Sequence, residues 1–237
     1  MKKITVVKLG MVEYQDALEL QEKLLGEVQE GEREDILLLV EHSPVITIGR
    51  SGKRSNILVP EDVLKSSGVQ IYDVNRGGDV TYHGPGQVVG YPIMDLKKHG
   101  RDIKEFVRKI QEVFIRLLKE EYGICARGED RKYTGVWIGE DKITAIGIAV
   151  KRWVTMHGFA FNVNTNLEHF KWIIPCGLEE RGITSLEKIT RQKQDLERLN
   201  DLVADYFCRV FELEREMLSA DSLAKGQGSR REAGKEP

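Results

Sequence analysis

Residues 76–87 read RGGDVTYHGPGQ and hold four glycines, one proline, one arginine and one histidine. Gly77 and Gly78 permit a close backbone approach or a positive φ, and the Gly-Pro-Gly run predicts a second tight turn. Between the two turns, the side chains of residues 81–83 project from a short extended segment. The stretch lacks the Gly-Lys-Ser/Thr ending of a P-loop, and a strand-like VVGYPI follows it where a dinucleotide fingerprint needs a helix. We therefore interpret it as a loop whose backbone walls a pocket.

Outward from this loop, the hydrophobic pattern predicts strands and helices in groups. Alternating or continuous apolar runs indicate strands, which we expect at residues 1–9, 35–40, 45–48, 69–74, 88–96, 134–139, 141–150 and 159–164. Apolar residues at helical spacing indicate amphipathic helices, which we expect at residues 14–30, 60–67, 102–121 and 194–212. Turn residues predict reversals at 139–141 and around 155–158.

This order of elements predicts an α/β chain of the α+β kind, because the strands do not alternate strictly with helices. With 237 residues and no internal linker or repeat, we expect a single mixed-sheet domain with flanking helices over residues 1–214. Residues 215–237 lose periodicity and end in the polar GQGSRREAGKEP, which predicts a charged, flexible C-terminal tail.

Composition excludes several classes of function. The net charge of −2 and a sequence pI of about 6.3 give no basic field for nucleic acid. No apolar run approaches the roughly 20 residues that span a bilayer, and residues 1–10 carry no export signal. Three widely spaced cysteines fit neither a disulfide framework nor a zinc site, so we expect a cytoplasmic protein with reduced thiols and no metal.

The segment WIIPCGLEERGITSL (172–186) contains the candidate nucleophile, Cys176. The Pro-Cys-Gly turn positions its backbone and leaves one neighbour without a side chain, although a cysteine packed in a turn would look the same. A free thiol with a pKa of about 8.5 is mostly protonated at neutral pH, so catalysis needs a base or a cation nearby. The candidates for that group are Lys142, His157, His169 and Lys171. Each alone is weak evidence, because Lys142 could be a solvated strand end and His157 a hydrogen-bonded turn residue.

Six segments in one order resemble the octanoyltransferases of lipoate biosynthesis, the lipoyl(octanoyl) transferase family. They are EHSPVITIGR (41–50), RGGDVTYHGPGQVVGYPI (76–93), KITAIG (142–147), HGFAFNVN (157–164), PCG (175–177) and ITSL (183–186). The resemblance covers most of the chain between residues 35 and 190. It implies the fold shared by lipoate–protein ligases and biotin protein ligases.

The resemblance also implies a reaction, its residues and its partners. An octanoyl group would pass from octanoyl-acyl carrier protein, through a thioester on Cys176, to a lysine of the lipoyl domains of 2-oxoacid dehydrogenases or of the glycine cleavage H protein. Lys142 would lower the pKa of the thiol and act as general base, with His157 in a supporting position and no cofactor. The implied substrate-binding residues are Arg76, Gly77, Gly78, Asp79, Val80, Thr81, Tyr82, His83, Ala145, Ile146, Gly147, Gly158, Phe159 and Ala160. Phe159-Ala160-Phe161 departs from the family pattern, which leaves the preferred acyl-chain length open.

Elementary chemistry is compatible with this assignment. Exchange of a thioester for a thiol is nearly isoenergetic, so the transfer needs neither ATP nor a metal. Two successive acyl transfers predict ping-pong kinetics. Two alternatives stay open at this point: an ATP-dependent lipoate or biotin protein ligase, and a non-catalytic protein that binds lipoyl domains or acyl carriers.

Overall fold

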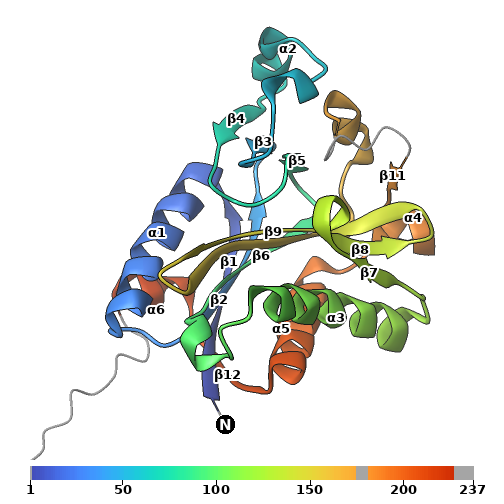
Figure 1. Cartoon of the computed structure of the whole chain (residues 1–237). Helices are drawn as coiled ribbons and strands as arrows, with labels where there is room; N and C mark the ends of the chain where they lie inside the picture. Colours follow the sequence, from blue (N-terminus) through green and yellow to red (C-terminus); the bar gives the residue numbers. More distant parts are fainter. Residues whose placement is uncertain (1, 175–180, 227–237) are drawn as a thin grey trace, which may run out of the picture.

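A computed structural model of the chain describes residues 2–174 and 181–226. Within them, a nine-stranded mixed sheet forms the centre of the fold, in the order β12-β1-β2-β6-β10-β9-β8-β7, with β11 beside β9 (Figure 1). Its strands are β1 (Lys2–Val12), β2 (Ile36–His42), β6 (Gln87–Ile93), β7 (Arg127–Glu129), β8 (Gly135–Ile138), β9 (Asp141–Lys151), β10 (Val154–Asn162), β11 (Gly182–Ile183) and β12 (Leu213–Met217). The strands from β2 to β7 along this order pair antiparallel, whereas β1 runs parallel to both of its neighbours.

Helices cover both faces of the sheet. The α-helices are α1 (Tyr14–Glu30), α2 (Glu61–Ser66), α3 (Ile103–Tyr122), α4 (Leu186–Thr190), α5 (Leu196–Phe211) and α6 (Ala220–Ala224). Helices α3 and α5 pack side by side on one face, and α1 and α6 lie over the other (Figure 1). No helix in the described residues is long and apolar enough to cross a membrane. The mixed sheet with helices on both faces confirms the predicted fold class.

Helix α3 forms where the sequence predicted it, for reasons that the structure makes visible. The Asp102 side chain caps its start by accepting hydrogen bonds from the backbone N–H groups of Lys104 and Glu105, at 2.9 and 3.1 Å. Gly123 ends it in the left-handed conformation, with φ at 66°. Its apolar stripe is buried against the sheet and α5. Helix α1 also has the predicted bounds.

A second, three-stranded sheet carries the glycine-rich motif. Its strands are β3 (Val45–Ile48), β4 (Gln70–Asp73) and β5 (Val80–His83), in the order β4-β3-β5. Together with α2 and the 3-10 segment Leu167–Trp172 it buries its own small apolar cluster. Strand β5 leads through the Gly-Pro-Gly turn into β6, so the motif joins the small sheet to the large one (Figure 1).

The prediction of a turn around residues 155–158 is wrong. These residues lie inside β10, and the hairpin reverses at Arg152 and Trp153, whose φ angles are 51° and 69°. Two central residues with positive φ are the signature of a type I′ hairpin turn, which usually contains Asn or Gly. Arg-Trp carries neither residue, so no local turn signal marks this position.

The boundary expected after residue 214 falls inside β12 in the structure. Residues Leu213–Met217 pair in parallel with β1, and α6 follows. In α6, Leu223 is only 4% exposed and packs in the apolar cluster beneath α1. The charged β12 lies at the sheet edge, where pairing uses the backbone and does not need apolar side chains. Residues 227–237, the rest of the expected tail, lie outside the described residues.

We therefore expect Leu223→Ala to destabilise the protein by about 2 to 3 kcal/mol, the usual cost of deleting a buried leucine side chain. The measurement is urea unfolding followed by circular dichroism. The matched control is Met217→Ala in β12, whose side chain is 44% exposed and whose loss should cost less than about 0.5 kcal/mol. A Leu223 variant as stable as the control would show that α6 is not part of the folded domain.

Candidate active site

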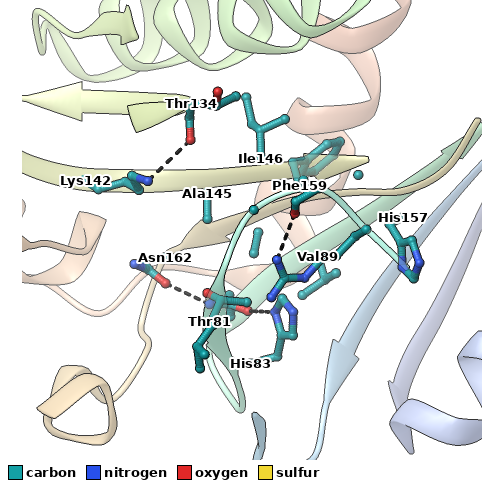
Figure 2. A pocket seen from close by; sticks show the side chains of 18 of the residues that line it. Thr81, His83, Val89, Thr134, Lys142, Ala145, Ile146, His157, Phe159 and Asn162 are labelled. Atoms are coloured by element: carbon teal, nitrogen blue, oxygen red, sulfur yellow. Dashed lines mark hydrogen bonds between the residues drawn. The ribbon is translucent and has the colours of Figure 1, made fainter. Parts of the chain in front are cut away.

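An apolar cavity lies between the glycine-rich motif and strands β6, β9 and β10 (Figure 2). It encloses about 770 Å³, counting the space at its open mouth. It gathers the predicted site residues except Asp79, Tyr82 and Cys176, namely Arg76, Gly77, Gly78, Val80, Thr81, His83, Lys142, Ala145, Ile146, Gly147, His157, Gly158, Phe159 and Ala160. Segments that are far apart in the sequence therefore meet in one place.

Glycines set the shape of this cavity by letting backbones approach each other. A Cβ on Gly147 would lie 2.8 Å from the carbonyl oxygen of Gly77, and a Cβ on Gly158 would lie 2.2 Å from that of Gly90. Neither position has room for a side chain. The Gly77 N–H donates a 2.9 Å hydrogen bond to the Ile148 carbonyl, which fixes the motif against β9.

Lys142 is a buried residue of the cavity wall. It is not a solvated residue at a strand end, which was the alternative that its position in the sequence left open. It follows the first residue of β9 and is 9% exposed. Its Nζ donates to the carbonyl of Thr134 at 3.3 Å and lies 4.8 Å from the centre of the Trp137 ring (Figure 2). Its backbone carbonyl accepts from the N–H of Thr184, beside the β11 pairing. The ammonium group is thus held at the cavity by both its main chain and its side chain.

Cys176 lies outside the described residues, as does the rest of 175–180. The described residues on either side of this gap are anchored through their backbones, and of the two it is Ile183 that lines the cavity. The Ile174 N–H donates to the Asn56 carbonyl at 2.8 Å, and Ile183 pairs with Lys142 and lines the cavity. The other cysteines do not line it; Cys125 is exposed, and Cys208 is buried with its pKa raised to about 11 by burial.

His83 belongs to a buried hydrogen-bond chain. Its Nδ1 donates to the amide oxygen of Gln87 at 2.8 Å, and the Gln87 amide nitrogen donates to Asn162 Oδ1 at 2.9 Å. Asn162 in turn donates to the Thr184 carbonyl at 3.1 Å. Burial lowers the pKa of His83 to about 3, with nearby His42 as a smaller cause. The imidazole is therefore neutral at physiological pH.

His157 lies inside β10 and not in a turn. Its φ of 57° is left-handed, and the Gln21 side chain of α1 accepts its backbone N–H at 2.9 Å. Its Nε2 donates to the Asn75 side-chain oxygen at 2.8 Å, which anchors the residue directly before the motif. Burial lowers the pKa of His157 to about 4, and the positive charge of Arg76 adds to the shift.

Arg76 connects the motif to the small sheet. Its Nη2 donates to the carbonyl and the hydroxyl of Thr47, at 2.8 and 2.9 Å, and its Nη1 donates to the Gly77 carbonyl at 3.0 Å. The guanidinium is 8% exposed and also lines the cavity. These bonds fix the conformation of the motif where it begins.

Two predicted residues of the motif lie outside this cavity. Because side chains alternate along β5, Thr81 and His83 face the cavity while the Tyr82 ring packs against Phe170 and bonds to His169 at 2.6 Å. Asp79 accepts the N–H of Val80 and the side-chain N–H of Asn56, at 2.8 and 2.7 Å.

The other two candidates for activating a thiol do not line the cavity either. His169 stacks on Trp172, and Lys171 is exposed and paired with Glu168. Among the residues that the structure describes, no group of three or more His, Cys, Asp and Glu side chains could hold a metal ion.

Sequence reasoning missed several residues of the wall, some of them inside the segments that carry the family resemblance and some outside them. These are Tyr14, Gln87, Val89, Tyr91, Thr134, Asn162, Phe170 and Ile183. Gln87 and Asn162 did carry a usable signal, because each is a polar residue in an otherwise apolar strand. Tyr14 and Thr134 had no such signal, since only tertiary packing brings α1 and the residue before β8 to the cavity.

Comparisons with known proteins show the family of this chain. The family model of the lipoyl protein ligase A/B catalytic domain matches residues 13–208. An octanoyltransferase of Desulforamulus reducens is 60% identical over 221 residues, which cover 93% of this chain and 96% of that protein. The fold is similar to that of a bi-partite lipoate protein ligase from Thermoplasma acidophilum, with a TM-score of 0.73 and 16% identity over 95% of this chain and 92% of that one. A biotin protein ligase from Aquifex aeolicus is more distant, with a TM-score of 0.51 and 13% identity over 90% and 70% of the two chains. The chain therefore belongs to the lipoyl protein ligase A/B family and, within it, to the octanoyltransferases.

Proposed function

We propose that this octanoyltransferase carries the octanoyl group as a thioester on Cys176, taking it from octanoyl-acyl carrier protein and passing it to a lysine of a lipoyl domain. The acceptors would be the lipoyl domains of 2-oxoacid dehydrogenases and the glycine cleavage H protein. The observation that carries the proposal is the buried Lys142 in the wall of an apolar cavity, beside the β11 strand that follows the Cys176 segment.

In the first half-reaction, the Cys176 thiolate attacks the carbonyl carbon of the donor thioester. A new carbon–sulfur bond forms, the bond to the carrier sulfur breaks, and the carrier thiolate leaves. The Lys142 ammonium stabilises the attacking thiolate by its charge and supplies the proton that the leaving sulfur takes up. The Thr134 carbonyl and the Trp137 ring, which contact Lys142, support this role by fixing the amine in the cavity wall.

In the second half-reaction, the acceptor lysine attacks the acyl-enzyme. Its ε-amine must be deprotonated to be a nucleophile, and neutral Lys142 accepts the proton that is lost as the amide bond forms. The Cys176 thiolate is released and pairs again with the Lys142 ammonium. Lys142 thus acts in both half-reactions, as a proton donor in the first and as a proton acceptor in the second.

The cavity suits an unbranched acyl chain. Its wall between Lys142 and His157 is formed by apolar side chains, those of Val89, Ala145, Ile146 and Phe159 (Figure 2). Ala160 also lines the cavity. Each buried methylene of the chain contributes about 0.8 kcal/mol. The histidines of the wall are neutral, so the chain meets hydrogen-bonded dipoles and not histidine cations.

Replacing Cys176 by Ala should abolish transfer while leaving the fold intact. Wild-type protein mixed with octanoyl-acyl carrier protein, without ATP, should gain the mass of one octanoyl group on the peptide that contains Cys176. The Cys125→Ala variant is the matched control and should be acylated like wild type, because Cys125 does not line the cavity. Retained turnover in Cys176→Ala, or acylation that requires ATP, would refute the thioester route and favour a ligase.

Replacing Lys142 by Ala should raise the pKa of the Cys176 thiol towards the ordinary value of about 8.5, because the neighbouring positive charge is lost. Peptide-resolved alkylation rates against pH measure this shift, with exposed Cys125 as an internal reference. Lys171→Ala, which removes an exposed lysine, should leave the profile in place. An unchanged profile in Lys142→Ala would exclude a role for this lysine in activating the thiol.

The buried neutral histidines should make the protein less stable in acid. Their pKa values are about 3 for His83 and about 4 for His157 in the folded chain, against 6.5 when unfolded, so the unfolded state binds more protons between these values. The free energy of unfolding should therefore fall as the pH drops from about 6.5 to 4, by up to about 1.4 kcal/mol per pH unit for each histidine.

Urea unfolding of wild type and of His157→Gln at several pH values tests this expectation. The variant should have the shallower pH dependence, because one of the two histidines is gone. Equal slopes in the two proteins would mean that His157 does not bind a proton on unfolding in this range.

A further inference from the structure

A second cavity lies next to the one described above, which we call the acyl cavity, on the other side of the glycine-rich motif. It encloses about 1020 Å³, counting open solvent, and we call it the arm groove. Residues that line only this groove are Ser51, Asp79, Val107, Arg131 and Ile148. The walls common to both cavities are Gly77, Gly78, Thr134, Ile146 and Gly147. A group that leaves the acyl cavity past Thr134 therefore enters the arm groove.

The floor of the groove is an open strand edge. Strand β8 pairs with β9 only as far as Ala145, and in the described chain no strand continues this edge beyond it. The motif meets the edge at a single backbone bond, from the Gly77 N–H to the Ile148 carbonyl. In an antiparallel strand, the N–H and C=O of one residue point to the same side, so the Ile148 N–H faces this edge too. Such an edge suits an extended ligand that contains amides.

The side chains around this edge are apolar inside and basic at the rim. Val107 of α3 and Ile148 of β9 are half-buried and offer apolar contact. Arg131 and Ser51 are exposed and lie on the rim. The carboxylate of Asp79, the acidic residue of the lining, already accepts hydrogen bonds from Val80 and Asn56.

Arg131 is connected to the catalytic end of the acyl cavity. Its φ is 60°, and its carbonyl accepts the N–H and the hydroxyl of Thr134, at 3.2 and 2.6 Å. The Thr134 carbonyl accepts the Nζ of Lys142. The turn that presents the guanidinium to the groove therefore also positions the proposed general base.

We propose that the arm groove binds the phosphopantetheine arm of the acyl donor, an inference that rests on the proposed transfer from an acyl carrier. The thioester end lies at Thr134 beside Lys142, and the two amides of the arm lie along the open edge of β9. The dimethyl group contacts Val107 and Ile148, and the phosphate lies at the rim beside Arg131 and Ser51. Arginine suits this position because its guanidinium donates charge-assisted hydrogen bonds to phosphate oxygens.

The groove fits the donor better than the acceptor. A lysine side chain has four methylenes and no amide, so it could not use the open edge of β9. The phosphopantetheine arm has amides, a branched apolar group and an anion in sequence, and the groove offers a partner for each. The donor arm also leaves with the first thiol, which frees the Cys176 thioester before the acceptor arrives.

The first test fills the groove with Val107→Phe and measures the rate of acyl-enzyme formation with two donors. Octanoyl-phosphopantetheine carries the whole arm, whereas the octanoyl thioester of 2-mercaptoethanol lacks the amides, the dimethyl group and the phosphate. The variant should lose about tenfold in kcat/KM with the first donor and about twofold or less with the second. Val63→Phe, on α2 and outside both cavities, adds the same bulk at a side chain that is 42% exposed and should match wild type.

The second test neutralises the rim with Arg131→Gln and compares octanoyl-phosphopantetheine with octanoyl-pantetheine, which lacks the phosphate. The variant should lose about tenfold with the phosphorylated donor only. Arg209→Gln, at an exposed arginine of α5 that pairs with Glu120, is the charge control and should match wild type. The assignment of the groove would be overturned if a variant lost the same factor in kcat/KM with both donors of its test. It would also be overturned if kcat/KM did not fall with either donor. If wild type itself is acylated by none of these donors, the proposed thioester route fails instead.

Discussion

The backbone contact between the glycine-rich motif and strand β9 is the constraint on which the rest of the site depends. The Gly77 N–H bonds to Ile148, and Gly147 has no room for a Cβ beneath the Gly77 carbonyl. This contact closes one side of the acyl cavity and, by the same backbone, forms the boundary of the arm groove. Arg76 and His157 secure the motif from the small sheet and from β10, so two separate parts of the fold maintain one close approach.

Around this contact, the site is built from buried polar groups whose hydrogen bonds are made by other parts of the chain. The series of hydrogen bonds from His83 through Gln87 to Asn162 gives each of these three side chains a partner, and none of the partners is ionised. Polar groups in such a setting hold fixed positions, because breaking one bond leaves a buried donor or acceptor unsatisfied. In the reaction that we propose, Lys142 is the residue of the wall that donates a proton and takes one up again.

Much of the fold could be predicted from the sequence, because the helices with long apolar stripes and strong caps, such as α3, depend on local signals. The hairpin turn at Arg152 and Trp153 and the strand β12 could not, because neither has the usual residues and tertiary pairing decides both. The site shows the same division. The motifs predicted most of the residues of the cavity wall. Tyr82 was predicted wrongly to line it, because side chains alternate along β5 and its ring faces Phe170. Tyr14 of α1 was missed, because no local sequence pattern marks it as a residue of the site.

The parallel pairing of β1 with β12 has a consequence for how the chain is made. Strand β1 is synthesised before both of its partners. Strand β2 follows it closely in the chain and pairs with one edge, but the other edge is completed only by residues 213–217. Until then, the growing chain exposes unpaired N–H and C=O groups along this edge, which is the kind of surface that recruits other strands. Closing a loop of this length costs entropy before the pairing contributes anything, so this edge should form late in folding. The period before closure is when the nascent enzyme is most prone to pair with the wrong strand.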